Sequence, residues 1–187
     1  RVTHLEPFGA FVDIGCGVTS LITIDNISIS RIAHPADRFA VGQGILAVVK
    51  EIDFDLRRIS LSHKELLGTW LENAAAFAPG DTVTGVVRGV QTVSGSIRSV
   101  ESYGTFIELT PNLAGLAEPS DTLTQGHTAA VYIKNIIPEK MKVKLSVIDS
   151  SPEKAAPAPF HYFITGGHID RWQYSPGLCG RTIESVF

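Results

Sequence analysis

The chain has 187 residues, 44% of them hydrophobic and 19% charged, which is ordinary for one or two small folded domains. Its 16 Lys and Arg residues against 19 Asp and Glu give a net charge of −3. This balance excludes a strongly basic protein that binds a duplex through its overall positive field.

No run approaches the roughly 18 apolar residues that a membrane-spanning helix needs, so we expect no membrane association. The two cysteines, Cys16 and Cys179, make no disulfide framework. We therefore expect free thiols and a reducing, cytoplasmic setting.

Short β-type segments follow one another through the first 62 residues. Residues 11–14, 19–24, 45–50 and 58–62 are β-branched or aromatic runs bounded by Gly, Asp or Asn. About five short strands in roughly 70 residues predict a small Greek-key barrel. Because position 1 falls inside an element, we expect the natural protein to extend upstream and this opening strand to be incomplete.

A helical linker is predicted over residues 63–80. Ser62 and Glu65 have the spacing of a capping box, and Gly68 is expected to bend or weaken the helix. Apolar residues recur after it at helical spacing: Leu66, Leu67, Trp70, Leu71, Ala74 and Phe77. We expect Trp70 to pack against a barrel rather than to contact a ligand.

Residues 81–149 repeat the pattern of the first module. Residues 97–109 match residues 2–14, and residues 125–146 match residues 42–62 in shorter form. Repetition at this scale indicates two homologous modules.

The second module also contains a tandem duplication of its opening strand. Residues 82–91 and 92–101 are identical at five of ten positions when the two segments are aligned. Only one copy can occupy the first barrel position in register. We expect this to be the second copy, because it runs directly into Tyr103 and Gly104; the first copy would be an added strand or hairpin.

Residues 150–159 have the composition of an extended linker, and residues 160–187 form a tail. In the tail, residues 160–165 and 168–174 flank a Gly-Gly pair, which predicts a β-hairpin. A tail of this size cannot stand alone, so we expect it to dock on a barrel or on another copy of the chain.

Three motifs in this order carry a specific resemblance to a known family. They are Phe8-Gly9-Ala10-Phe11-Val12, then Gly42-Gln43 before a Val-rich strand, then residues 51–62. Both modules resemble the RNA-binding repeat of the bacterial ribosomal protein S1 family. The resemblance implies an all-β fold of two tandem five-stranded OB-fold (S1-type) barrels, here joined by a short helix and followed by a small C-terminal β-hairpin tail.

The resemblance also implies where RNA is held, against strands two and three of each barrel. The candidate RNA-binding residues are Phe8, Phe11, Thr23, Asp53 and Arg58 in the first module and Tyr103, Phe106 and Lys142 in the second. Flat rings stack unpaired bases with little sequence preference, and a cation pairs with phosphate or stacks on a base.

The family's strand-three histidine is absent from both modules. It falls on Thr23, which can still donate a hydrogen bond, and on Glu118, which places a negative charge where the RNA backbone would run. The position of Asp53 becomes Ile137 in the second module. We therefore expect the first module to be the better binder.

Two ordinary readings of these residues stay open. Phe11 and Phe106 lie in alternating strands and are also compatible with core positions. Lys140, Lys142 and Lys144 alternate with apolar residues, as on any solvated sheet face.

The sequence shows no enzyme constellation. It has no phosphate loop, nucleophile elbow or paired-cysteine metal spacing, and His161, His168 and Cys179 match no common metal site. We expect no catalytic activity, no metal and no cofactor.

The leading hypothesis is a bacterial protein that binds single-stranded RNA with low sequence specificity. It would act in translation, on mRNA and the small ribosomal subunit, or in RNA metabolism. One alternative is a protein-interaction scaffold that contacts its partner through the second module or the tail. Another is the RNA-targeting tail of a larger protein.

Overall fold

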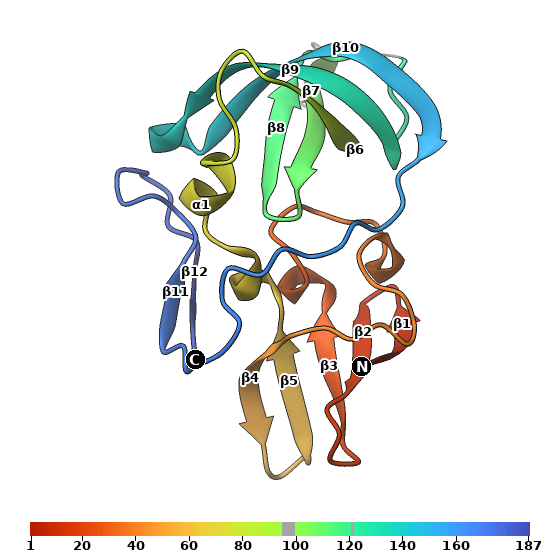
Figure 1. The fold of residues 1–187 in the computed structure, drawn as a ribbon, viewed down its shortest axis with the longest axis vertical. Helices are drawn as coiled ribbons and strands as arrows, with labels where there is room; N and C mark the ends of the chain where they lie inside the picture. Colours follow the sequence, from red (N-terminus) through yellow and green to blue (C-terminus); the bar gives the residue numbers. More distant parts are fainter. Residues whose placement is uncertain (95–99, 121) are drawn as a thin grey trace. The chain divides into compact units, whose positions relative to one another are not determined.

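The computed structural model of the protein describes residues 1–94, 100–120 and 122–187, with the backbone alone for residues 89–94 and 100–103. The chain divides into two compact units (Figure 1). Unit 1 comprises Arg1–Thr69, Ala156–Tyr174 and Thr182–Phe187, and unit 2 comprises Trp70–Ala155 and Ser175–Arg181. Each unit is built mainly from β-strands, so the predicted all-β fold class is confirmed.

Unit 1 is built on a five-stranded sheet of order β1-β2-β3-β5-β4. The strands are β1 (Val2–Glu6), β2 (Gly9–Asp13), β3 (Thr19–Thr23), β4 (Val48–Asp53) and β5 (Arg58–Ser62). The β3–β5 pair is parallel, and the other pairs are antiparallel. The outer strands β1 and β4 share no ladder, although Val2 exchanges backbone hydrogen bonds with Gln43 and Gly42.

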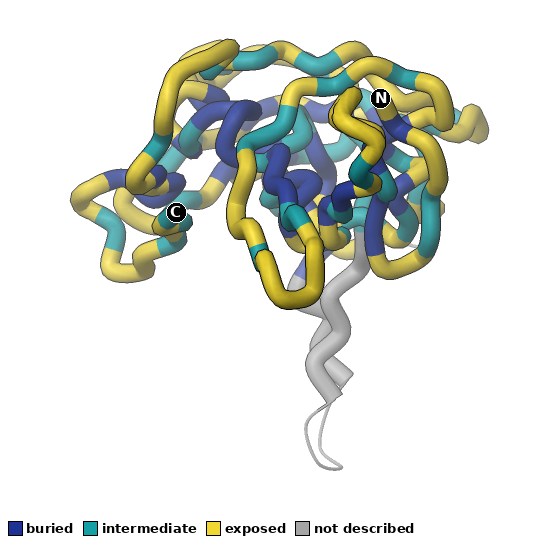
Figure 2. The backbone as a smooth tube through the Cα atoms, turned by 90° about the horizontal axis from the view of Figure 1, so that it is seen from below, coloured by how far each residue is buried: buried dark blue, intermediate teal, exposed yellow. Residues whose placement is uncertain are grey.

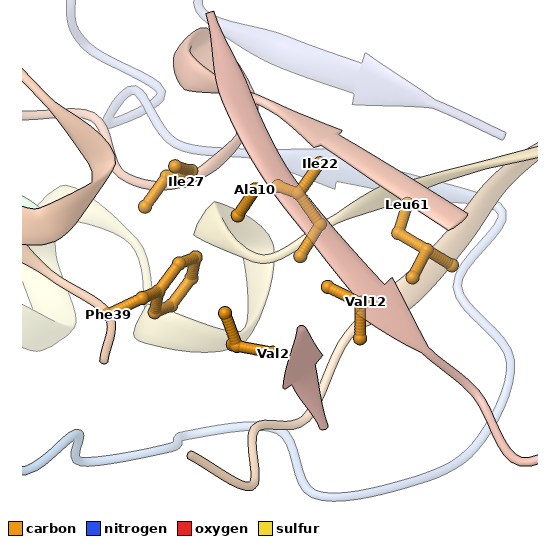
Figure 3. Packing of buried hydrophobic residues seen from close by; sticks show 7 residues of the cluster. All are labelled: Val2, Ala10, Val12, Ile22, Ile27, Phe39 and Leu61. Atoms are coloured by element: carbon orange, nitrogen blue, oxygen red, sulfur yellow. The ribbon is translucent and has the colours of Figure 1, made fainter. Parts of the chain in front are cut away.

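The core of unit 1 lies on one face of this sheet. Side chains of alternating strand residues and of two loop residues pack together there: Val2, Ala10, Val12, Ile22, Ile27, Phe39 and Leu61 (Figure 3). Because successive side chains of a strand point to opposite faces, Phe11 lies on the other face from Ala10 and Val12. Phe11 is half-buried and stands outside the core cluster, so it is not an ordinary core residue.

Unit 2 contains a closed barrel in which β10, β8, β7, β6 and β9 are neighbours in that order. The strands are β6 (Thr82–Ser94), β7 (Val100–Thr110), β8 (Leu113–Ala117), β9 (His127–Ile137) and β10 (Lys142–Lys154). Buried stretches alternate with exposed turns along the described chain (Figure 2). The strand order is that of unit 1, with β6 in the place of β1 and β9 in the place of β4.

The tandem duplication is arranged differently from the prediction. In the first copy, residues 82–86 pair with β9 and residues 86–91 pair with β7, so this copy closes the barrel. The second copy extends the hairpin: its residues 92–94 and 100–101 lie at the ends of β6 and β7, and its residues 95–99 lie outside the described part of the chain.

The expectation that the second copy fills the barrel position is therefore wrong. Pairing of Gly89 with Phe106 repeats the pairing of His4 with Phe11, which fixes the first copy in the barrel register. Only this copy contains residues that pair with β9, namely residues 82–86. A ladder on both sides decides the register, and sequence adjacency to Tyr103 does not.

The predicted linker helix is divided into two short pieces. A 3₁₀ turn, η3, covers Lys64–Leu67, and α1 covers Trp70–Ala74. Between them Gly68 has φ 84°, a left-handed conformation that interrupts a helix. No reciprocal capping box forms; the Ser62 hydroxyl instead donates a hydrogen bond to the buried Glu65 carboxylate, and Trp70 is only 2% exposed, as expected of a packing residue.

The remaining helices are single 3₁₀ turns: η1 (Ile24–Asn26), η2 (Pro35–Asp37) and η4 (Pro138–Lys140). Among the described residues, the helices are all too short to cross a bilayer.

Residues 160–174 and 182–187 of the tail belong to unit 1, where the strands differ from the predicted ones. Strand β11 (Arg171–Gln173) pairs antiparallel with β12 (Glu184–Val186), and residues 160–165 form no strand. The hairpin predicted around Gly166-Gly167 is therefore wrong. Its first arm is held by side-chain contacts with the unit 1 core, and these contacts replace the expected ladder.

Two tail aromatics enclose His63, which is fully buried. The Phe160 ring lies 4.7 Å from the His63 ring, and the Tyr162 hydroxyl lies 3.2 Å from His63 Nε2. His63 Nδ1 lies 2.8 Å from the Ile27 carbonyl oxygen. In the neutral ring, Nδ1–H therefore donates to Ile27 and Nε2 accepts from Tyr162, so both nitrogens are satisfied without a charge.

Acidification is expected to destabilise unit 1 through His63. Burial, with a smaller contribution from the Arg38 charge, lowers the pKa of His63 to about 4, from about 6.5 in an unfolded chain. Between these values the unfolded chain binds a proton that the folded unit does not. The free energy of unfolding should therefore be highest above pH 6.5 and fall by up to about 3 kcal/mol by pH 4.

Urea denaturation at a series of pH values from 7.5 to 4 measures this dependence. The fluorescence of Trp172, in a Trp70→Phe background, reports the unfolding of unit 1. A His63→Gln variant should lose most of the decline, and the exposed His168→Gln control should retain it. Equal pH dependence in all three proteins would refute the role of His63.

Candidate nucleic-acid interface

The outward face of the unit 1 sheet carries a row of side chains across four strands. Phe11 on β2 pairs with His4 on β1 and with Leu21 on β3, and Leu21 pairs with Ser60 on β5. His4 is exposed, and the other three are partly exposed. This row is an accessible surface with an aromatic ring near its centre.

A second ring extends the row at the β1–β2 turn. Phe8 is 55% exposed, and its ring lies edge-on to Phe11 at a centroid distance of 6.0 Å. Between them a Cβ atom on Gly9 would lie 2.4 Å from the Ile22 carbonyl oxygen. Only glycine allows β2 to approach β3 this closely, so Gly9 holds the two rings on one surface.

Three other predicted residues lie around this aromatic pair. Thr23 is opposite Gly9 at the end of β3, and its hydroxyl accepts a hydrogen bond of 2.8 Å from the Asn26 amide. Arg58 is exposed on β5, two positions from Ser60 and so roughly 7 Å along the strand from the Phe11 row. The structure places Phe8 and Thr23 at one end of the face, Phe11 near its centre and Arg58 at the other end.

Asp53 pairs with Arg58 across the β4–β5 hairpin, where its side chain also has a structural task. Asp53 Oδ1 accepts a 2.8 Å hydrogen bond from the Leu56 backbone N–H and so closes the turn. This bond still leaves the second carboxylate oxygen for another partner.

Unit 2 repeats this arrangement at equivalent positions. Phe106 on β7 pairs with Gly89 on β6 and Leu116 on β8, and Leu116 pairs with Lys144 on β10. Phe106 is 37% exposed, whereas its neighbour Ile107 is fully buried, so the ring points away from the barrel core. The predicted residue Tyr103 lies in β7, where its side chain is outside the described part of the structure.

Gly104 repeats the close approach of Gly9. A Cβ atom on it would lie 2.6 Å from the Ala117 carbonyl oxygen, and its φ of +138° is one that side-chain-bearing residues rarely adopt. The same backbone constraint therefore precedes the outward aromatic residue in both modules.

Charges in unit 2 are paired around the face. Glu118, which stands where unit 1 has Thr23, forms an ion pair of 3.1 Å with Lys134. Its negative charge is therefore partly compensated on this surface. Lys142 is exposed at the start of β10, in the place of Arg58.

A second ion pair was not predicted from the sequence. Arg88 Nε lies 2.7 Å from Glu108 Oε2, and the two side chains are only 10% and 6% exposed. Both residues occupy outward positions of their strands, where alternation predicts solvent exposure. No sequence signal in one strand reveals that such a position is covered.

Metal ligands are not gathered in the described structure. Among the residues it describes, no group of three or more His, Cys, Asp or Glu side chains is placed to hold a metal ion. The two free cysteines differ in exposure: Cys16 is exposed and Cys179 is partly buried.

The profile of the S1 RNA binding domain matches residues 1–64, which include β1–β5 and the outward aromatic row. The chain is also 31% identical, over 159 residues, to the small ribosomal subunit protein bS1 homolog of Bacillus subtilis strain 168. The chain belongs to the S1 RNA-binding domain family. The alignment covers 79% of this chain and therefore includes sequence from both S1 modules.

Further comparisons give the same family. The small ribosomal subunit protein bS1 of Staphylococcus aureus strain COL is 32% identical over 166 residues, covering 82% of this chain and 40% of the relative. The Bacillus alignment covers 39% of that protein, so the chain spans about two-fifths of the length of these curated relatives.

One solved structure also aligns with the S1 modules. It is a multidomain protein with nucleic acid binding domains from Streptococcus pneumoniae, 17% identical, matched over 79% of this chain and 49% of its own. With a TM-score of 0.34, this similarity supports no inference about fold or function.

Proposed function

We propose that this chain binds single-stranded RNA, with low sequence specificity, on the outward faces of its two S1 modules. The observation that carries the proposal is the equivalent placement of Phe11 and Phe106. Each ring stands partly exposed at the centre of a sheet face, next to a glycine-dependent close approach of two strands.

The chemistry of these faces fits unpaired bases. Aromatic side chains stack on any base for about 1–3 kcal/mol each, while nearby cations contact the backbone. Both modules offer this combination: Phe8 and Phe11 with Arg58 in unit 1, and Phe106 with Lys142 in unit 2. Stacking is tolerant of sequence, so low specificity follows.

The relatives support a place in translation. They are named as proteins of the small ribosomal subunit, and we propose that this chain likewise contacts mRNA and that subunit in the bacterial cytoplasm. It acts in this proposal as a binding protein and not as an enzyme.

Fluorescence anisotropy with a labelled unstructured 12-nucleotide RNA, at low and physiological salt, tests the proposal. We expect binding that weakens as salt rises, and weaker binding to an RNA duplex of equal length. Absence of binding even at low salt would refute the proposed function.

A protein-interaction scaffold is the second candidate, and one observation favours it. The tip of the β4–β5 hairpin exposes two large apolar side chains close together in sequence, Phe54 at 84% and Leu56 at 61%, and exposed apolar patches mark interaction sites. If the chain fails to bind RNA, and a Phe54→Ala, Leu56→Ala variant loses association with ribosomes, the scaffold role is favoured.

The third candidate function is that of the RNA-targeting tail of a larger protein, since the relatives are longer than this chain. If this chain is one part of a longer protein, the same faces would direct that protein to RNA. RNA binding by the isolated chain is required in this case too, so the anisotropy experiment tests both.

A further inference from the structure

The two modules present equivalent faces that differ in charge. Residues are equivalent where they have the same strand partners, as Phe11 and Phe106 do. By this criterion Arg58 and Ser60 on β5 correspond to Lys142 and Lys144 on β10.

In unit 1 the described charges on and beside this face are mainly negative. They are the carboxylates of Asp13, Glu51 and Asp53 and the cations of Lys50 and Arg58. On β1, Glu6 adds another carboxylate, 2.6 Å from His4 Nε2. RNA that stacks on Phe11 therefore brings its phosphates toward carboxylates.

In unit 2 the equivalent positions are mainly positive. They carry Glu108 and Glu118 against Arg88, Lys134, Lys142 and Lys144, and the positions of Glu51 and Asp53 become the uncharged Asn135 and Ile137. Arg88 pairs with Glu108 and Lys134 pairs with Glu118. Among the described residues, no ion pair involves Lys142 or Lys144, so their charges are available to an incoming anion.

Lys142 and Lys144 lie where they can contact the phosphates of an RNA bound at Phe106. Val143 and Leu145 are buried in the barrel, so Lys142 and Lys144 both point outward, about 7 Å apart. Lys144 lies level with Leu116, which pairs with Phe106, so two strand spacings of about 4.8 Å separate Lys144 from the ring. A base stacked on Phe106 therefore has its phosphates beside the lysines.

We propose that the second module supplies the phosphate contacts of the RNA interface, through Lys142 and Lys144 beside Phe106, and that the first module contributes mainly base stacking. This rests on the proposed RNA binding and reverses the expectation from the sequence that the first module binds better. The reversal has two causes: the Glu118 charge is paired with Lys134, and Lys142 and Lys144 on β10 form no ion pair with an acidic residue in the part of the chain that the structure describes.

The salt dependence of RNA binding by the full chain tests this division of phosphate contacts and base stacking between the two modules. Each phosphate contact to a single strand contributes about 0.7 to the slope of log affinity against log salt concentration. A Lys142→Gln, Lys144→Gln variant should bind the labelled 12-nucleotide RNA more weakly, with a slope shallower by about 1.4. The matched variant of the first face, Lys50→Gln, Arg58→Gln, should lose less affinity and less slope.

A variant that is expected to bind RNA more tightly keeps the test decisive even if a weakened variant fails to fold. Ser60→Lys, Glu51→Asn gives the first face the charges of the second at these two positions, those of Lys144 and Asn135, and should strengthen binding with a steeper slope. If the first-face variant loses more affinity than the lysine variant, or the gain-of-function variant binds no better, the division is overturned while RNA binding stands. If the wild-type chain binds no RNA, the proposed function and this inference fail together.

Discussion

Replacing both Phe11 and Phe106 with alanine is expected to weaken binding of an unstructured RNA by at least about 30-fold. Each ring contributes about 1–3 kcal/mol of stacking, and about 1.4 kcal/mol corresponds to a factor of ten. Either single substitution should weaken binding by about 5- to 150-fold. Anisotropy at one fixed salt concentration measures both effects.

Stability should change little in these variants, because both rings lie on outward faces and outside the buried core. The matched control is Phe54→Ala, which removes a ring of the same type that is 84% exposed at a hairpin tip. We expect the control to change affinity less than about twofold. If Phe54→Ala costs as much affinity as Phe11→Ala, the hairpin tip and not the sheet face is the main contact.

The second large effect concerns the buried ion pair of unit 2. Replacing Arg88 with methionine should lower the free energy of unfolding of this unit by about 3–5 kcal/mol, because it leaves the Glu108 charge buried without its cation. Urea denaturation followed by the fluorescence of Trp70, in a Trp172→Phe background, reports this unit.

Two further variants separate pairing from packing. Arg88→Met, Glu108→Leu removes both charges and should recover most of the lost stability. Lys134→Met breaks the exposed pair with Glu118 and should cost less than about 1 kcal/mol. A loss below about 1 kcal/mol for Arg88→Met alone would show that Glu108 does not depend on this arginine.

Strand positions were largely predictable, because alternation in one segment reports which face is buried. Residues 58–62 form β5 as predicted. The sequence left open whether Phe11 and Phe106 face the core, and the structure decides this through the buried residues on either side of each ring. Residues 45–47 are different: they were expected in a strand, but β4 begins at Val48. Their equivalents in β9 pair with β6, and a ladder on that side is absent in the unit 1 sheet.

Features that depend on distant partners were not predictable from one segment. The register of the duplicated strand is decided by β9, whose paired residues lie 42 to 50 positions further along the chain. Phe160 and Tyr162 read as a strand of their own, yet His63 and Phe39 hold them in the unit 1 core. The same holds for charge: Glu118 looked repulsive to RNA until its distance to Lys134 was known.

RNA binding on the two outward faces is tested most directly by mapping the RNA on the chain by nuclear magnetic resonance. Amide shifts of the ¹⁵N-labelled full chain are followed as an unstructured RNA is added. We expect the largest shifts along the two outward rows, at Phe11 and Leu21 on β2 and β3 and at Phe106 and Leu116 on β7 and β8. Shifts confined to the β4–β5 hairpin tip or the C-terminal tail, with both rows unchanged, would contradict binding on these faces.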